Sequence, residues 1–137
     1  MGSFCDVVVA STREAKKIAA ANGNLGQWPS CSLKGLSHVS FATLYEILTS
    51  KSVDEVLSDF DFLHTDESVI VQRFPNAVVK ALAQLEKPKL ARVAKKWSRT
   101  EELEGYKIAE LQPFLEELTA IARDAGRTPL LLCVSGF

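Results

Sequence analysis

The sequence has few cysteines, no long apolar run and almost no net charge, and each of these absences excludes a class of protein. Its three cysteines, Cys5, Cys31 and Cys133, are scattered and form no CxxC pair, so we expect free, reduced thiols rather than a disulfide framework. The longest apolar run, residues 129–134, is far shorter than the roughly 20 residues needed to cross a bilayer. With 16 Lys and Arg against 17 Asp and Glu, the formal charge of −1 gives no global field for nucleic acid or anionic membranes. We therefore expect a cytoplasmic protein that binds neither membrane nor nucleic acid.

Motifs of nucleophilic catalysis and nucleotide binding are also missing. There is no GxSxG, no SxxK and no Cys/His signature of a thiol enzyme. His64, Ser135 and either Asp59 or Asp61 are the residue types of a catalytic triad. Almost any chain of this length with two histidines offers such a combination, so it is no evidence of catalysis. The glycines of residues 23–26 follow a predicted helix, whereas phosphate-binding loops run from a strand into a helix N-terminus. We therefore predict no catalytic residues and no cofactor, and we favour a binding protein over an enzyme.

Metal and redox sites find equally little support. Cys31 and His38 lack a second pair of ligands, and no recognised zinc spacing occurs, so no metal site is predicted. Cys5 and Cys133 lie on two strands that we expect to be neighbours, which leaves a redox pair open. Nothing nearby would lower a thiol pKa as a cation or a helix N-terminus does, so two buried thiols are the favoured interpretation.

What is present describes an ordinary folded domain. The 137 residues are 47% hydrophobic and 24% charged, close to the average of soluble globular proteins. A chain of this length buries roughly two-thirds of the surface that it exposes when unfolded, enough for one core without metals or disulfides. We find no interdomain linker, internal repeat or low-complexity segment, so residues 1–137 are predicted to form a single domain.

Two patterns predict the strands of a sheet. Residues 4–10 and 130–134 are short apolar runs, the first with three consecutive valines, and such runs suit strands buried on both faces. We expect these two terminal strands to pair at the centre of the sheet. The side-chain pattern changes to a period of two in residues 60–62 and 69–72. With residues 65–68 between them, these two runs are typical of a β-hairpin.

Helical periodicity and capping signals predict the remaining elements. Capping-box sequences at residues 11–14 and 98–101 indicate helix starts, and Asn22-Gly23 and Gly126 indicate left-handed helix ends. We expect helices at about residues 12–21, 37–49, 53–57, 76–87, 89–97 and 111–125. Pro113 is expected in the first turn of the last one. Together these elements predict an α+β fold, with a small mixed or antiparallel sheet of about four strands (the central hairpin and both terminal strands) packed with five or six helices on one face.

The segment at residues 22–36 is the least regular part of the chain and gives one hypothesis of function. It contains three glycines and exceeds the usual loop length, as binding loops often do. Trp28 and Cys31 within it, with His38 just beyond, are candidates to line a pocket. A tryptophan in a long loop is, however, more often an anchor to the core. The alternative function is therefore a small-molecule-binding domain or an enzyme whose pocket lies at residues 22–36.

Segregated charge is the most unusual feature and gives the preferred hypothesis. Residues 87–99 carry six basic side chains and no acidic one, whereas residues 54–67 carry six acidic side chains and no lysine or arginine. On a helix over residues 89–97 the apolar side chains share one face. The opposite, basic face consists of Lys89, Arg92, Lys95 and Lys96. Most such faces are only solvated surface; the sharper interpretation is docking onto an acidic patch of this chain or of a partner. We therefore predict a binding or regulatory domain that acts by protein–protein contact, with a protein partner or a second copy of itself.

Overall fold

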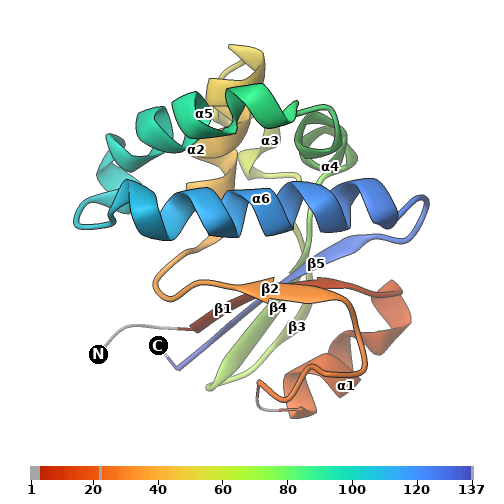
Figure 1. The fold of residues 1–137 in the computed structure, drawn as a ribbon. Helices are drawn as coiled ribbons and strands as arrows, with labels where there is room; N and C mark the ends of the chain where they lie inside the picture. Colours follow the sequence, from red (N-terminus) through yellow and green to blue (C-terminus); the bar gives the residue numbers. More distant parts are fainter. Residues whose placement is uncertain (1–3, 22, 137) are drawn as a thin grey trace.

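The computed structural model describes residues 4–21 and 23–136 and confirms the α+β class (Figure 1). One open antiparallel sheet has the strand order β2-β1-β5-β4-β3, so it has five strands where the sequence predicted about four. The strands are β1 (Phe4–Val9), β2 (Ser30–Ser32), β3 (Asp61–Thr65), β4 (Val69–Arg73) and β5 (Leu130–Ser135). The α-helices of this part of the chain are α1 (Ala15–Ala20), α2 (His38–Thr49), α3 (Asp54–Leu57), α4 (Asn76–Ala83), α5 (Leu90–Ser98) and α6 (Ile108–Asp124). Three short 3₁₀ helices accompany them: η1 (Thr12–Glu14), η2 (Lys87–Lys89) and η3 (Glu101–Leu103).

The two terminal strands pair with each other, as predicted. β5 occupies the middle of the sheet, with β1 on one side and β4 on the other. Phe4 lies opposite Ser135 in the antiparallel register. Residues 7–9 and 130–132 are buried on both faces of the sheet, because apolar side chains point in both directions from these strands. The sheet is therefore completed only when the last strand inserts between the first strand and the hairpin.

The fifth strand, β2, lies inside the segment 22–36 that the sequence indicated as a loop. Its three residues pair with Val8, Val7 and Asp6 of β1 at the edge of the sheet. Two of the three are exposed serines, so neither hydrophobic alternation nor β propensity marks this strand in the sequence. Asn22, half of the predicted helix end, lies outside the described residues, and Gly23 after it has a left-handed φ of 82°.

Helices cover both faces of the sheet, which corrects the expectation of a single covered face. α1 packs against β3, β4 and β5 on one side, whereas α2, α4, α5 and α6 form a layer on the other side (Figure 1). The two faces of β1 contribute to separate cores. Val7 and Val9 belong to the larger core with α2 and α6, whereas Val8 packs with Ile18 and Ala19 of α1. The small apolar side chains of α1 allow close packing on the sheet. The sequence does not indicate which face of the sheet this helix covers.

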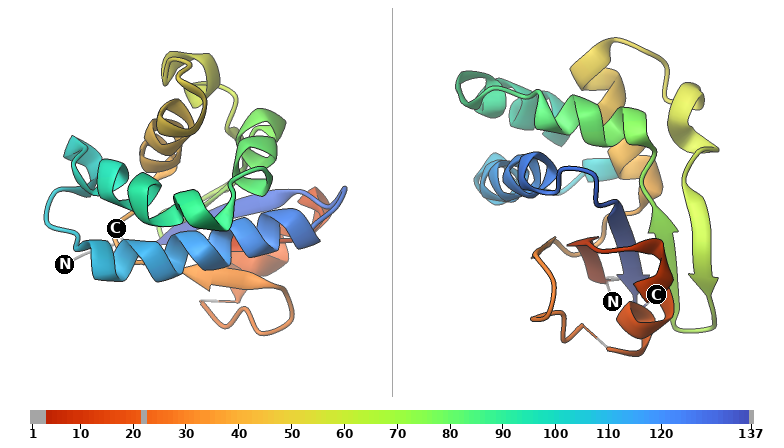
Figure 2. Two further views of the ribbon diagram at one scale, coloured as in Figure 1. Left: turned by 45° about the horizontal axis from the view of Figure 1, so that its top comes forward. Right: turned by 90° about the vertical axis from the view of Figure 1, so that its right-hand side faces the viewer.

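The predicted hairpin is confirmed and forms the second edge of the sheet, as the right-hand view of Figure 2 shows. β3 and β4 pair antiparallel, with Asp61 opposite Arg73 and Thr65 opposite Ile70. The register shifts between Phe62 and His64, which marks a bulge in the edge strand.

The first predicted capping box, at residues 11–14, forms only in part. The Ser11 hydroxyl accepts a hydrogen bond from the Arg13 N–H at 3.3 Å, and a 3₁₀ turn precedes α1. The Glu14 carboxylate does not return to the backbone of Ser11. It accepts instead from the indole Nε1 of Trp28 at 2.7 Å, because the folded chain brings that donor within reach.

The second predicted capping box, at residues 98–101, does not form. The hydroxyls of Ser98 and Thr100 donate backwards to the carbonyls of Lys95 and Trp97, each at 2.7 Å. These bonds satisfy carbonyls at the end of α5, so the two side chains close one helix rather than open the next.

Two helices differ in extent from the prediction. α6 begins at Ile108 rather than near residue 111, so Pro113 lies in its second turn on the exposed side. Because proline has no N–H, it cannot donate the helical hydrogen bond to the carbonyl of the exposed Ala109. α4 ends at Ala83, about one turn earlier than expected, and Pro88 falls within η2. Among the helices of residues 4–21 and 23–136, none is long and apolar enough to span a membrane.

Candidate functional site

The basic residues predicted for partner binding share one exposed surface along α5. The buried side of this helix consists of Leu90, Val93, Ala94 and Trp97. The indole Nε1 of Trp97 donates to the Ser40 carbonyl at 3.0 Å, and its ring stacks on that of Phe114 with 6.4 Å between centroids. The exposed side, which we call the α5 basic face, consists of Lys89 at the end of η2 and of Arg92, Lys95 and Lys96. α5 is therefore held firmly by its apolar side while its basic side faces solvent.

The α5 basic face has no carboxylate partner within the described chain. Among residues 4–21 and 23–136, the pair within salt-bridge distance is His64 and Asp66, which lies on the hairpin. The acidic segment 54–67 begins on α3, which packs against α2. No described carboxylate of this segment lies within salt-bridge distance of a cation of α5. Like charges on adjacent turns repel weakly, so an acidic group supplied from outside would stabilise this face.

A shallow groove of mixed polarity continues the α5 basic face toward α2. It has a volume of about 430 Å³, and Lys96 of α5 and Thr100 line one side of it. Thr43, Glu46 and Ile47 of α2 line the other side. Because it combines a cation, a carboxylate, hydroxyls and one apolar side chain, this groove offers hydrogen bonds and contact area beside the cluster of charge.

The three residues predicted to line a pocket at the segment 22–36 lie in three different places. Trp28 packs with the core beneath α1 and anchors its segment through the bond to Glu14. Cys31 belongs to the core on the opposite face of the sheet, and burial, reinforced by Glu117, raises the pKa of its thiol to about 12. His38 packs edge-on against the Phe60 ring at 5.8 Å, and burial lowers the pKa of its imidazole. The structure does not bring these side chains together.

A hollow of about 550 Å³ does lie beside this segment, but other residues line it. We call it the β1–β2 hollow. Its lining includes Phe4 and Asp6 of β1 together with Ser32, Leu33 and Lys34. The Ser32 hydroxyl donates to the Asp6 carboxylate, and the Lys34 ammonium lies 5.2 Å from the centroid of the Phe4 ring. The pairing of β1 with β2 assembles this lining. Because β2 was not predicted from the sequence, this hollow could not be predicted either.

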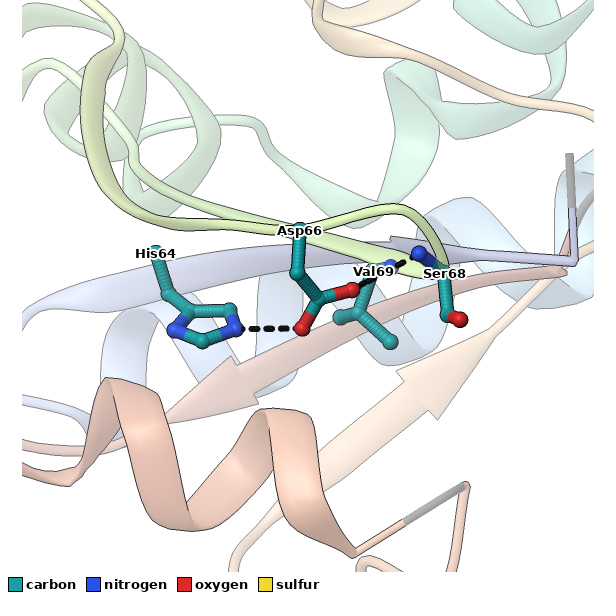
Figure 3. Close-up of polar contacts among 4 residues, drawn as sticks. All are labelled: His64, Asp66, Ser68 and Val69. Atoms are coloured by element: carbon teal, nitrogen blue, oxygen red, sulfur yellow. Dashed lines mark hydrogen bonds and ion pairs between the residues drawn. The ribbon is translucent and has the colours of Figure 1, made fainter.

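His64, one member of the triad that could be sketched from the sequence, has a structural carboxylate partner, as Figure 3 shows. Its Nε2 lies 2.7 Å from Oδ2 of Asp66. The other carboxylate oxygen of Asp66 accepts from the backbone N–H groups of Ser68 and Val69, at 2.7 and 2.9 Å. The His64 hydrogen bond, followed by these two, lowers the pKa of Asp66 to about 2. Asp66 therefore closes the hairpin turn and fastens it to β3.

The thiols of Cys5 and Cys133 lie on adjacent strands but on opposite faces of the sheet. Cys5 is opposite Val134 and Cys133 is opposite Asp6, so the two side chains point into separate cores. Both are free, and burial raises the pKa of each, in Cys133 to about 11. A disulfide between them is geometrically excluded in this fold. In the part of the chain that the structure describes, no three His, Cys, Asp or Glu side chains gather as metal ligands would.

Comparisons with known proteins give no functional assignment. No model of a protein family matches the chain, and no curated protein matches it. Among solved structures, the chain is similar to the crystal structure of YfbM from Escherichia coli, a protein of unknown function. The two share 16% identity, with 99% of this chain and 100% of that chain covered and a TM-score of 0.44. What this protein does must therefore be argued from its own surface.

Proposed function

We propose that this protein is a single cytoplasmic binding domain that recognises an acidic surface of a partner protein through the α5 basic face. The observation that supports the proposal is the combination of four exposed cations without a carboxylate partner in the described chain and a helix fixed by its opposite side. Fixed charges of one sign speed diffusional encounter with a surface of the opposite sign and select the partner's orientation.

The anchoring of α5 makes this face suitable for recognition. Trp97 and its neighbours are buried among the rings of α2 and α6, so the backbone beneath the four cations does not need to become ordered when a partner binds. Binding then costs mainly the ordering of the long side chains, at roughly 0.5–1.5 kcal/mol for each one immobilised. The groove beside Lys96 would add direct hydrogen bonds to the partner.

The decisive experiment reverses charge on α5 and compares the result with reversal elsewhere. Arg92→Glu combined with Lys96→Glu changes the α5 basic face, and Lys16→Glu combined with Lys17→Glu changes two exposed lysines of α1 on the other side of the sheet. The α5 double variant should lose the partner that the wild-type protein retains at low ionic strength. The α1 double variant should retain it. Rising salt should release the wild-type complex, because exposed charge pairs are screened.

The fold should survive these changes. Surface substitutions shift stability by about 0.5 kcal/mol per site, and a glutamate in the last turn of α5 adds an unfavourable helix-dipole interaction of about 0.3–1 kcal/mol. Equal retention of the partner by both double variants would contradict the proposal. If the retained complex contains nucleic acid, the α5 basic face binds nucleic acid rather than an acidic protein surface. Self-association at low salt that the α5 double variant loses would instead make a second copy of the chain the occupant.

The alternative function is the binding of a small molecule, and the β1–β2 hollow supports it. Its volume of about 550 Å³ suits a metabolite, and Asp6, Ser32 and Lys34 supply polar groups that converge on it. Ligand-detected NMR screening of a fragment library would test this candidate. Hits that survive Ser32→Ala and Lys34→Ala would exclude this hollow as their site.

A further inference from the structure

A second cluster of cations surrounds a hollow that the sequence did not indicate as a candidate site. The hollow has a volume of about 540 Å³ and lies between α4, the C-terminal end of α6 and the start of β5. The left-hand view of Figure 2 shows these three segments side by side. Its cationic lining consists of Arg73, Lys80, Arg123 and Arg127. We call this site the α4–α6 cavity.

The charges of the α4–α6 cavity have one sign. No aspartate or glutamate is among its described lining residues, and none of its four cations is ion-paired with a described carboxylate. Arg73 also borders a neighbouring hollow that contains Asp59 and Asp61, so the other three cations carry most of the unbalanced charge. Several cations around one concave space attract an anion and are stabilised by it.

Arg123 is fixed in place before any ligand arrives. Its Nε donates to the Ala83 carbonyl at 2.9 Å, and its Nη2 donates to the Leu85 carbonyl. These bonds use two of the five N–H donors of the guanidinium and hold it against the end of α4. The remaining donors are available to an oxyanion, and the planar fork of arginine matches two oxygens of a phosphate group.

The floor of the cavity is apolar. Its accessible apolar surface comes from the half-buried Val79, Ala83 and Pro129, because Phe74 and Leu130, which also line it, are only 1% and 0% exposed. The volume falls in the range of about 300–1,000 Å³ that is typical of small-molecule sites. A ligand that fits both parts has an anionic head and a compact apolar body.

We propose that the α4–α6 cavity binds the phosphate group of a small phosphorylated molecule. Lys80, Arg123 and Arg127 contact the phosphate oxygens, and the organic part lies against the half-buried apolar lining of Val79, Ala83 and Pro129. This site is separate from the α5 basic face, so the proposal does not depend on the proposed protein partner.

Phenyl phosphate is a suitable probe because it combines one phosphate with one apolar ring. Titrated into isotope-labelled protein, it should shift the backbone amide signals of Asn76, Gly126 and Thr128, which line the cavity. Lys80→Gln combined with Arg127→Gln removes two exposed cations that make no described side-chain hydrogen bond, and should weaken binding by at least about tenfold. Lys16→Gln combined with Lys17→Gln on α1 is the matched control and should leave the affinity unchanged.

Three further probes define the specificity. Inorganic phosphate should bind more weakly than phenyl phosphate because it leaves the apolar floor uncovered, and benzyl alcohol should not bind. Benzoate should bind more weakly because it presents fewer oxygens and less charge. The proposal is overturned if phenyl phosphate at millimolar concentration shifts none of the three amides, or if the shifts centre on α5. Equal weakening by both double variants, or equal affinity for benzoate, also overturns it.

Discussion

At the scale of single residues, Gly35 and Tyr106 form a contact that ties the segment after β2 to the segment before α6. Gly35 has a left-handed φ of 83°, and a Cβ added there would overlap the Tyr106 hydroxyl oxygen. That hydroxyl donates to the carbonyl of Lys34. Gly35 is therefore required both by its backbone conformation and by the close approach of the tyrosine.

A double-mutant cycle separates these two requirements. Gly35→Ala should cost about 2–3 kcal/mol, of which about 1–2 is the left-handed conformation and the rest the displaced hydrogen bond. Gly105→Ala is the matched control, because Gly105 has φ 93° with open space around it, and should show the conformational part alone. In a Tyr106→Phe background the cost of Gly35→Ala should fall to that of Gly105→Ala. Urea denaturation measures the free energy of unfolding of the three single variants and of the Gly35→Ala, Tyr106→Phe double variant. Equal costs of the two glycine changes in the wild-type background would contradict the contact.

Asp66 gives the hairpin a defined dependence on pH. The His64 hydrogen bond and two backbone N–H bonds lower the pKa of its carboxyl from 3.8 to about 2. Because the folded pKa is depressed, the stabilisation by Asp66 is complete above about pH 4 and is lost as the pH falls through about 2. The amide signals of Ser68 and Val69 should titrate with a midpoint near 2. A midpoint near the ordinary carboxyl value of 3.8 would show that these contacts do not persist in solution.

At the scale of elements, α6 is the helix around which the larger core is built. α4 and α5 both pack on it, and most of its apolar stripe, whose side chains are spaced three and four residues apart, is buried. Leu118 is fully buried near the middle of that stripe. A change at this position tests the packing of the whole layer of helices.

Leu118→Ala should reduce the free energy of unfolding by about 2–5 kcal/mol, because it removes buried methyl groups and leaves a cavity. Glu116→Ala, two residues away on the exposed side, is the control and should change it by no more than about 0.5 kcal/mol. Chemical denaturation of both variants provides the measurement. A loss below about 1 kcal/mol for Leu118→Ala would mean that α6 does not face the core in solution.

Elements with strong periodicity could be predicted from the sequence, and elements defined by distant partners could not. α2, α5, α6, the hairpin and both terminal strands follow patterns of burial that are local. β2 is three residues of mostly exposed serine and exists only because β1 offers it an edge. Glu14 fits a capping box locally, yet its carboxylate bonds to Trp28, fourteen residues away.

The same distinction applies to the candidate sites. The α5 basic face could be found because its cations recur along one helix with a regular period. The α4–α6 cavity could not, because Arg73, Lys80, Arg123 and Arg127 come from a strand end, two helices and a loop. Each of these cations is unremarkable in its own stretch of sequence. Only the packing of α4 on α6 and the turn into β5 bring them around one hollow.

At the scale of the whole molecule, a net charge of −1 conceals separate regions of opposite sign. The α5 basic face and the α4–α6 cavity are cationic, whereas the acidic residues of segment 54–67 are exposed around α3 and the hairpin. The overall balance excludes a global field but leaves local fields intact within a Debye length of about 8–10 Å. The local electric field is therefore a property of these surfaces and not of the composition.

The pairing of the first strand with the last makes the molecule suitable for backbone cyclisation. Phe4 lies opposite Ser135, so joining residue 137 to residue 1 would place five residues, 136, 137 and 1–3, between β5 and β1. That number falls within the usual length of hairpin loops. Closing the chain restricts the unfolded ensemble, and by analogy with long disulfide-closed loops the cyclic protein should be more stable by about 2–4 kcal/mol. Urea denaturation compares it with the same cyclic protein reopened at a protease site inserted in the joining segment, which should return to the linear value. If cyclisation brings no gain, or reopening does not reverse it, then the ends of β1 and β5 are not held together in solution.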